Sequence, residues 1–194
     1  MFAPQDEGFV VSAPLKLPRA IRLDPSDGFV FRRAAEPGEW LVSGSFLFDP
    51  QRVAELDAKG RSAFRSGFLG IDSFGWSTLA VVTEATPAEY EQALVLLAGR
   101  FVEKLGAPGL SAARDAAAEE LAFAASLCDH PPQTLLALHR TLEEGEIRER
   151  FRILVPRGDR PKDAFRAFEF VEVEGEDEIV ERVDLMNLGK GGTP

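Results

Sequence analysis

The chain has 194 residues, a mass of 21.2 kDa and one cysteine. It is therefore long enough for one ordinary folded domain, and it cannot close a disulfide within itself. Its 22 basic and 32 acidic residues give a net charge of −10. A field of that sign repels phosphate backbones and anionic lipid headgroups, so we expect neither a nucleic-acid partner nor a membrane partner.

The two ends of the chain are expected to lie outside the folded domain. Met1 to Glu7 carry acids where a signal peptide needs bases, and no apolar run approaches the length of a membrane helix, so we expect a cytoplasmic protein. Prolines are frequent in residues 1–18, which predicts a flexible arm. Residues 19–188 are expected to form a single domain, and residues 189–194 a disordered tail.

The first part of the domain is predicted to be a hairpin. Phe29 and Phe31, and then Leu41, Ser43, Ser45 and Leu47, stand at every second position, which predicts strands over residues 28–34 and 39–48. Between these runs lies Glu36-Pro37-Gly38-Glu39. A Pro-Gly pair is typical of a type II turn, because proline presets φ and glycine accepts a positive φ.

A helix and a strand are expected next. Asp49-Pro50 predicts a helix start, since the aspartate accepts a capping bond and proline suits the first helical position. The apolar stripe of this helix consists of Val53, Leu56, Gly60 and Phe64. Trp76 to Glu84 is rich in β-branched residues and predicts a strand.

Two long helices are predicted in the middle of the chain. Thr86-Pro87-Ala88-Glu89 is a capping box, and the apolar spacing that follows continues to about Leu105. Gly106 and Pro108 then end the helix. An alanine-rich helix is expected from about Ser111 to Leu127.

A second hairpin is predicted together with its register. One apolar face consists of the pairs Leu142–Ile147, Leu138–Phe151 and Leu136–Ile153. The other face carries the pairs Thr141–Arg148, His139–Arg150 and Ala137–Arg152. A slip of one residue would mix apolar and charged side chains on the same face, so the pattern specifies this register. A last strand is expected over about residues 165–173.

The predicted order of elements is ββαβααβββ, with the strands mostly in hairpins. This order is typical of an α+β domain. We expect a mainly antiparallel sheet of about six strands, with two to three helices packed on one face.

Cys128-Asp129-His130 is the first candidate for chemistry, with Glu119 and Glu120 one or two helical turns earlier. A reactive thiol with an adjacent base, or a metal site, is one interpretation. The favoured interpretation is a buried structural cysteine, because a helix C-terminus raises a thiol pKa. The chain also offers too few Cys and His ligands for a typical zinc site, so no metal is expected.

The arginines at 148, 150 and 152 are the second candidate, with His139 beside them on the predicted sheet face. Guanidinium groups match carboxylate or phosphate, so Arg148, Arg150 and Arg152 are candidates for an anion site. The favoured interpretation is a solvated face. Its arginines would pair with acids of a neighbouring strand, for which Glu169, Glu172 and Glu174 are available.

The segment from Phe64 to Trp76 is the third candidate, because it combines glycines with aromatic residues. Such a loop can bend sharply and present flat apolar groups to a ligand. Its candidate ligand-binding residues are Arg65, Phe68, Phe74 and Trp76. The alternative, that these aromatic side chains complete the core, is favoured.

Several stretches of the chain resemble a family of short bacterial proteins that is known only as an uncharacterised domain. They are Ile21-Arg22-Leu23-Asp24-Pro25-Ser26-Asp27, Phe64-Arg65-Ser66-Gly67-Phe68-Leu69-Gly70, Gly75-Trp76-Ser77-Thr78-Leu79 and Phe123-Ala124-Ala125-Ser126-Leu127-Cys128-Asp129-His130-Pro131. The resemblance covers about residues 19–188. It implies a folded domain and supplies no reaction, cofactor or catalytic residue.

We therefore expect a non-catalytic accessory or binding protein, without a cofactor, that acts through a surface for a protein partner or a small ligand. The alternative is an enzyme that acts on a small anionic metabolite, with the arginine face as the anion site and Cys128 or Glu120 reacting. A homo-oligomeric structural protein is the third hypothesis.

Overall fold

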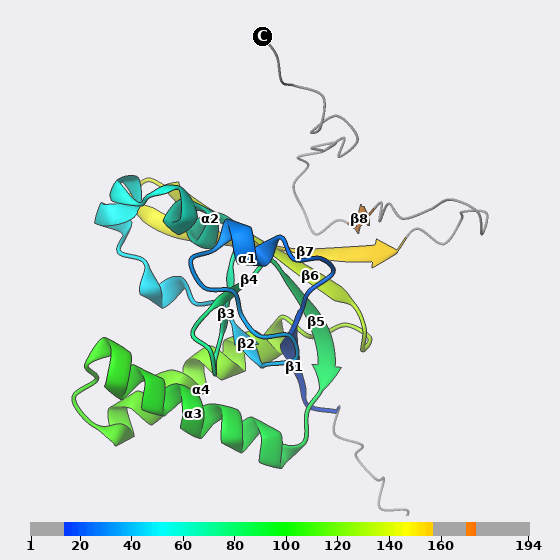
Figure 1. Ribbon diagram of the computed structural model, residues 1–194. Coiled ribbons are helices and arrows are strands. Elements are labelled where there is room, and N and C mark those ends of the chain that lie inside the picture. Colours follow the sequence, from blue (N-terminus) through cyan, green and yellow to red (C-terminus); the bar gives the residue numbers. More distant parts are fainter. Residues whose placement is uncertain (1–13, 157–169, 174–194) are drawn as a thin grey trace, which may run out of the picture.

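The computed structural model describes residues 14–156 and 170–173 (Figure 1). Its strands are β1 (Lys16–Ile21), β2 (Leu41–Val42), β3 (Phe68–Gly70), β4 (Trp76–Ser77), β5 (Leu79–Glu84), β6 (Leu135–Glu143), β7 (Glu146–Pro156) and β8 (Phe170–Val173). Its α-helices are α1 (Asp27–Val30), α2 (Ala58–Ser66), α3 (Pro87–Leu105) and α4 (Leu110–Ser126). Two 3₁₀ helices, η1 (Ser45–Leu47) and η2 (Pro50–Glu55), lie between β2 and α2.

The α+β class is confirmed, but the strands divide into two sheets where we expected one. In the described residues, one antiparallel sheet has the order β1-β5-β6-β7-β8 and the other the order β2-β3-β4. The predicted strand over 76–84 breaks at Thr78 into β4 and β5, which belong to different sheets. Thr78 donates its hydroxyl to the buried carboxylate of Asp27 at 2.5 Å, and this contact holds the break in place.

The predicted first hairpin is wrong, although its turn is present. Gly38 has a φ of 91°, and the Glu39 N–H donates to the Glu36 carbonyl, as a type II turn requires. The residues before the turn form α1, and β2 pairs with β3 instead. Phe31 is 1% exposed whereas Phe29 is 75% exposed, because residues two apart share a face in a strand but not in a helix.

The single helix expected after Asp49 is interrupted by a second capping residue. Asp49 caps η2 by accepting from the Gln51 N–H at 2.9 Å. Asp57 then caps α2 by accepting from the Gly60 N–H at 2.8 Å. A second aspartate that binds the backbone locally competes with a continuous helix, so two shorter helices form.

The two long helices and the second hairpin are confirmed. The Thr86–Glu89 capping box is complete, and Gly106 closes α3 in the left-handed conformation with a φ of 68°. β6 and β7 pair in the predicted register. The last predicted strand is present as β8, while residues 165–169 lie outside the described residues.

β1 begins at Lys16, within the residues that were assigned to the N-terminal arm. This strand is at the end of the strand order, where Pro18 is tolerated without a ladder donor. Residues 1–13 and the predicted tail at 189–194 lie outside the described part of the chain. Within the described ranges, we find no helix with the length and apolarity needed to cross a membrane.

The small sheet contributes to two hydrophobic clusters, because its side chains alternate between its faces. Val42 and Leu69 pack in a cluster with the buried faces of α3 and α4. Leu41 and Phe68 pack in the other cluster, with residues of β5 and β6. Figure 1 shows α3 and α4 side by side as one layer below the strands. The segment that follows β2 is therefore attached to both clusters.

Candidate functional site

A buried ion pair lies at the centre of the β6–β7 hairpin. Arg140 is 1% exposed, and its Nε donates to Glu149 Oε1 at 2.6 Å. The two residues face each other in the register and lie on the face predicted to be apolar, between the Leu138–Phe151 and Leu142–Ile147 pairs. That expectation is corrected: the core face contains a charged pair. The predicted register implies this pair, because it places Arg140 opposite Glu149.

The other donors of Arg140 join the hairpin to two further segments. Nη1 donates to the carbonyl oxygens of Ala63, Phe64 and Gly67, at distances of 3.3, 3.1 and 2.8 Å. Nη2 donates to the carbonyl of Ser43, just after β2. A cation is favourable at the C-terminus of α2, and burial of a charge is costly unless its donors are satisfied. Arg140 therefore connects β6, α2 and the segment after β2.

Glu149 connects this pair with α4. Its Oε1 also accepts from the Ser43 hydroxyl at 2.6 Å. Phe123 of α4 packs edge-on against Phe151 at 5.7 Å, so Glu120, one turn earlier, lies on the side of Glu149. Burial raises the pKa of Glu120 to about 7, and the negative charge of Glu149 adds to this effect, while Arg140 opposes it. Glu120 is therefore partly protonated near neutral pH.

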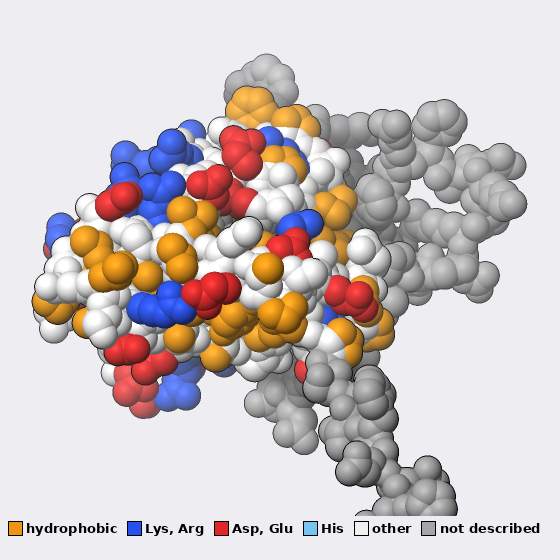
Figure 2. Space-filling model, turned by 90° about the horizontal axis from the view of Figure 1, so that it is seen from below, with side chains coloured by type: hydrophobic (Ala, Val, Ile, Leu, Met, Phe, Trp, Pro, Cys, Tyr) orange, Lys and Arg blue, Asp and Glu red, His pale blue; other side chains and the backbone are white. Residues whose placement is uncertain are grey.

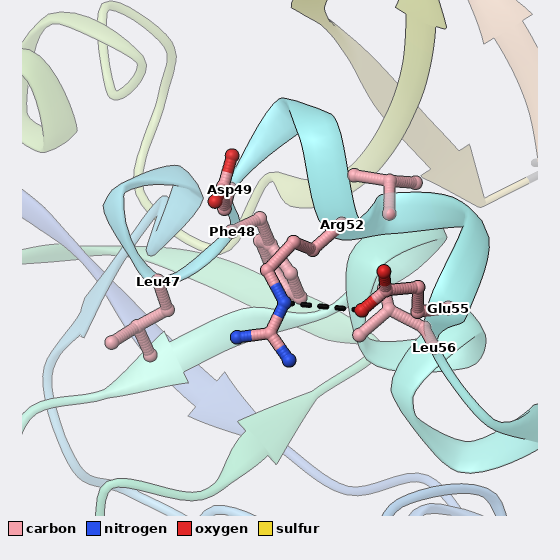
Figure 3. Close-up of a pocket in the computed structure, with 7 residues that line it drawn as sticks. Leu47, Phe48, Asp49, Arg52, Glu55 and Leu56 are labelled. Atoms are coloured by element: carbon pink, nitrogen blue, oxygen red, sulfur yellow. Dashed lines mark hydrogen bonds and ion pairs between the residues drawn. The ribbon is translucent and has the colours of Figure 1, made fainter.

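A hollow of about 270 Å³ opens beside this polar centre (Figure 3). Its lining residues come from η1, η2 and their connections: Leu47, Phe48, Asp49, Arg52, Val53, Glu55 and Leu56. Arg52 Nε donates to Glu55 Oε2 at 3.1 Å. Figure 3 shows the Arg52 guanidinium between Leu47 on one side and Glu55 and Leu56 on the other. The hollow thus combines apolar walls with charged groups.

Phe48 is the aromatic part of the lining, and its ring is held from several sides. Phe64 contacts it edge-on at 5.2 Å, and Trp76 stacks on it at 5.3 Å. The guanidinium carbon of Arg140 lies 5.6 Å from the centre of the ring. These contacts keep the ring in one position before any ligand arrives. The buried ion pair therefore positions the lining of the hollow.

The four loop residues predicted to bind a ligand are placed in different surroundings. Phe68 is completely buried. Phe74 is half-buried and packs against the hydrophobic cluster that includes the buried faces of α3 and α4. Arg65 is exposed on α2. Trp76 is half-buried, and its ring stacks on that of Phe48. The structure therefore connects Trp76 to the hollow.

The glycines of this loop have a packing role that is visible at Gly70. A Cβ there would lie 2.5 Å from the carboxyl group of Glu39. That carboxylate accepts from the N–H groups of Asp72 and Ser73 at 2.9 Å and from the Ser73 hydroxyl at 2.5 Å. Gly70 thus allows Glu39 to approach and bind the turn between β3 and β4.

The arginine face of the hairpin is paired within the hairpin itself. Arg150 lies 3.2 Å from Glu143, and Arg148 lies 3.6 Å from Glu143 and 3.7 Å from Glu146. The expected partners Glu169, Glu172 and Glu174 have side chains outside the described part of the chain, so that pairing stays a prediction. A hydrogen bond from Thr141 lowers the pKa of Glu143, and the two arginines contribute to that effect. His139 and Arg152 are half-buried in the same hairpin.

Cys128 is completely buried and packs with Leu136 and Leu138. Burial raises the pKa of its thiol to about 12, so the thiolate is scarce at neutral pH. His130 is half-buried, and its carbonyl accepts from Lys16 Nζ at 2.7 Å. Across residues 14–156 and 170–173, no three His, Cys, Asp or Glu side chains are grouped so that they could hold a metal ion.

Comparison with known proteins identifies a family for this chain. A family model described as a family of unknown function (DUF6505) matches residues 15–166. No curated protein and no solved structure matches the chain.

Proposed function

We propose that the chain, which belongs to the family of unknown function DUF6505, is a non-catalytic binding protein that accepts one apolar side chain of a partner protein in the hollow lined by residues 47–56. The observation that carries this proposal is the fixed Phe48 ring in a small hollow with charged groups around it. Hot spots of protein interfaces are pockets of this kind, in which an apolar anchor is surrounded by polar groups.

The size of the hollow favours a side chain over a metabolite. Pockets for drug-sized ligands have volumes of about 300–1,000 Å³. The volume here, about 270 Å³, lies below that range. Leu47, Val53 and Leu56 supply aliphatic walls, so an aliphatic or aromatic anchor is the best match.

The charged residues at the hollow suit a protein partner. Arg52 and Glu55 have side chains that are 73% and 66% exposed, so both stay hydrated in the free protein. In a complex they can pair with polar groups around the anchor, as at the rim of ordinary interfaces. A lining that is already in place also reduces the entropy lost on binding.

The alternative, an enzyme with an anion site on the arginine face, has less support. Glu143 and Glu146 lie within ion-pair distance of Arg148 and Arg150 and compete with an incoming anion. Cys128 is buried with a raised thiol pKa, so it is unsuited to nucleophilic attack.

Photo-crosslinking in the cells that produce the protein tests the proposal. Val53 is replaced by p-benzoylphenylalanine, and the same residue replaces exposed Gln92 of α3 as the control. We expect position 53 to crosslink a protein that position 92 does not, and Leu56→Asp to abolish the product because it places a charge in the hollow. Identical products from both positions, or a product that survives Leu56→Asp, would count against the proposal.

A further inference from the structure

A basic surface lies on α2 and the segment beside it. It consists of five exposed cations: Arg32, Arg33, Lys59, Arg61 and Arg65. Arg32 lies 2.5 Å from Asp57 at the start of α2, and Lys59 Nζ donates to the Phe31 carbonyl at 3.4 Å. These contacts place the two segments side by side. Figure 2 shows Lys and Arg side chains gathered at one edge of the molecule.

Little of this positive charge is neutralised nearby. Among the described residues, one of the five cations, Arg32, has a carboxylate within ion-pair distance, and this carboxylate is Asp57. Arg61 donates to the Leu56 carbonyl at 2.5 Å, and its charge also acts on Asp57, the carboxylate that pairs with Arg32. A basic surface whose cations outnumber the carboxylates beside them attracts acidic segments, even on a chain of net charge −10.

The chain contains an acidic segment that matches this surface. Residues 174–184 hold six carboxylates and one arginine, and they include the apolar pair Ile179-Val180. On the receiving side, α1 contacts α2 and exposes Phe29 and Val30, which are 75% and 38% exposed. Both the charges and the apolar side chains therefore have counterparts.

The segment is also within reach. It follows β8 directly, and Val173 of β8 pairs with Ile153 of β7. Four residues along β7, Glu149 pairs with Arg140, which binds the carbonyls at the end of α2. Those four residues span about 13 Å, whereas eleven extended residues span up to about 36 Å.

We propose that the acidic segment 174–184 of the chain binds the basic surface of α2 in the same molecule. This assignment does not depend on the hollow at residues 47–56.

Carbodiimide crosslinking of the full-length protein tests this proposal, because it joins a lysine amine to a carboxylate in direct contact. Mass spectrometry compares Lys59 with exposed Lys104 at the end of α3 as the internal control. We expect Lys59 to join carboxylates of residues 174–184 in monomers, with a yield about fivefold above that of Lys104 and a decrease in 0.5 M NaCl.

The double variant Arg61→Glu/Arg65→Glu should lower this yield about fivefold, because it replaces attraction by repulsion. Arg114→Glu/Arg148→Glu makes the same charge change elsewhere and should leave the yield unchanged. Equal yields at Lys59 and Lys104, products confined to dimers, or products that resist salt would each overturn the proposal. The salt series on the unaltered protein decides the question even if the double variant fails to fold.

Discussion

Arg140 shows how one buried side chain organises this protein. Its guanidinium binds Glu149, the end of α2 and the segment after β2, and it lies next to Phe48. A buried ion pair contributes little net stability, since desolvation of both ions offsets their attraction. Its effect here is to select one arrangement of the segments that it joins.

Replacement of Arg140 tests this role. Arg140→Met leaves Glu149 as an unpaired, mostly buried charge, so we expect the free energy of unfolding to fall by about 3–5 kcal/mol. Arg140→Met/Glu149→Leu removes both charges and should recover most of that loss. Urea denaturation measures both effects, with exposed Arg148→Met as the control. Equal losses in the single and double variants would contradict the account.

Glu120 predicts a specific dependence of stability on pH. In the unfolded chain its pKa is about 4.3, whereas in the folded protein it is about 7. The folded state binds more protons between these values, so the contribution of Glu120 to stability is largest below about pH 4.3 and is lost as the pH rises through about 7. Glu120→Gln removes this titration.

We therefore expect Glu120→Gln to unfold like the unaltered protein at pH 4.5. At pH 8 it should be more stable by about 1 kcal/mol, a value reduced for the part of the side chain that water screens. Thermal unfolding at both pH values measures the difference. A gain that is the same at pH 4.5 and pH 8 would show that the proton is not involved.

At the scale of the elements, the helices and strands that were predicted correctly are those whose local sequence signals all agree. α3 has a complete capping box, a long apolar stripe and a glycine stop, and all of these signals agree. Phe29 and Phe31, two residues apart, favoured a strand over residues 28–34, but the chain forms α1 there. Asp27 at the start of α1 accepts a hydrogen bond from distant Thr78, a contact that a local pattern does not contain. Pairing of β2 with β3 is likewise a long-range choice that local pattern does not contain.

Replacement by alanine should have opposite effects at Gly99, inside α3, and at Gly106, which ends this helix. Gly99 lies inside the helix, and a Cβ there would have no neighbour within 4 Å. Gly99→Ala should therefore stabilise the protein by about 0.5–1 kcal/mol. Gly106 has a φ of 68°, so Gly106→Ala should destabilise it by about 1 kcal/mol. Urea denaturation measures both, and a shift of the same sign in both variants would refute the assignment.

At the scale of the whole molecule, the site forms where distant segments meet. The fold class, the long helices and the β6–β7 register follow from sequence pattern. The hollow does not, because its lining depends on the break between η2 and α2 and on the support of Phe48 by Trp76. The sequence signal for this region is the pair of opposite charges at Arg140 and Glu149, which the predicted register places opposite each other and which our prediction did not use.

The central claim is that the hollow at residues 47–56 binds an apolar side chain. Methyl NMR of the full-length protein, titrated with N-acetyl-leucine amide, tests it most directly. We expect saturable shifts at Leu47, Val53 and Leu56, with exposed Leu110 of α4 unchanged as the control. Shifts that do not saturate, or equal shifts at Leu110, would contradict the claim.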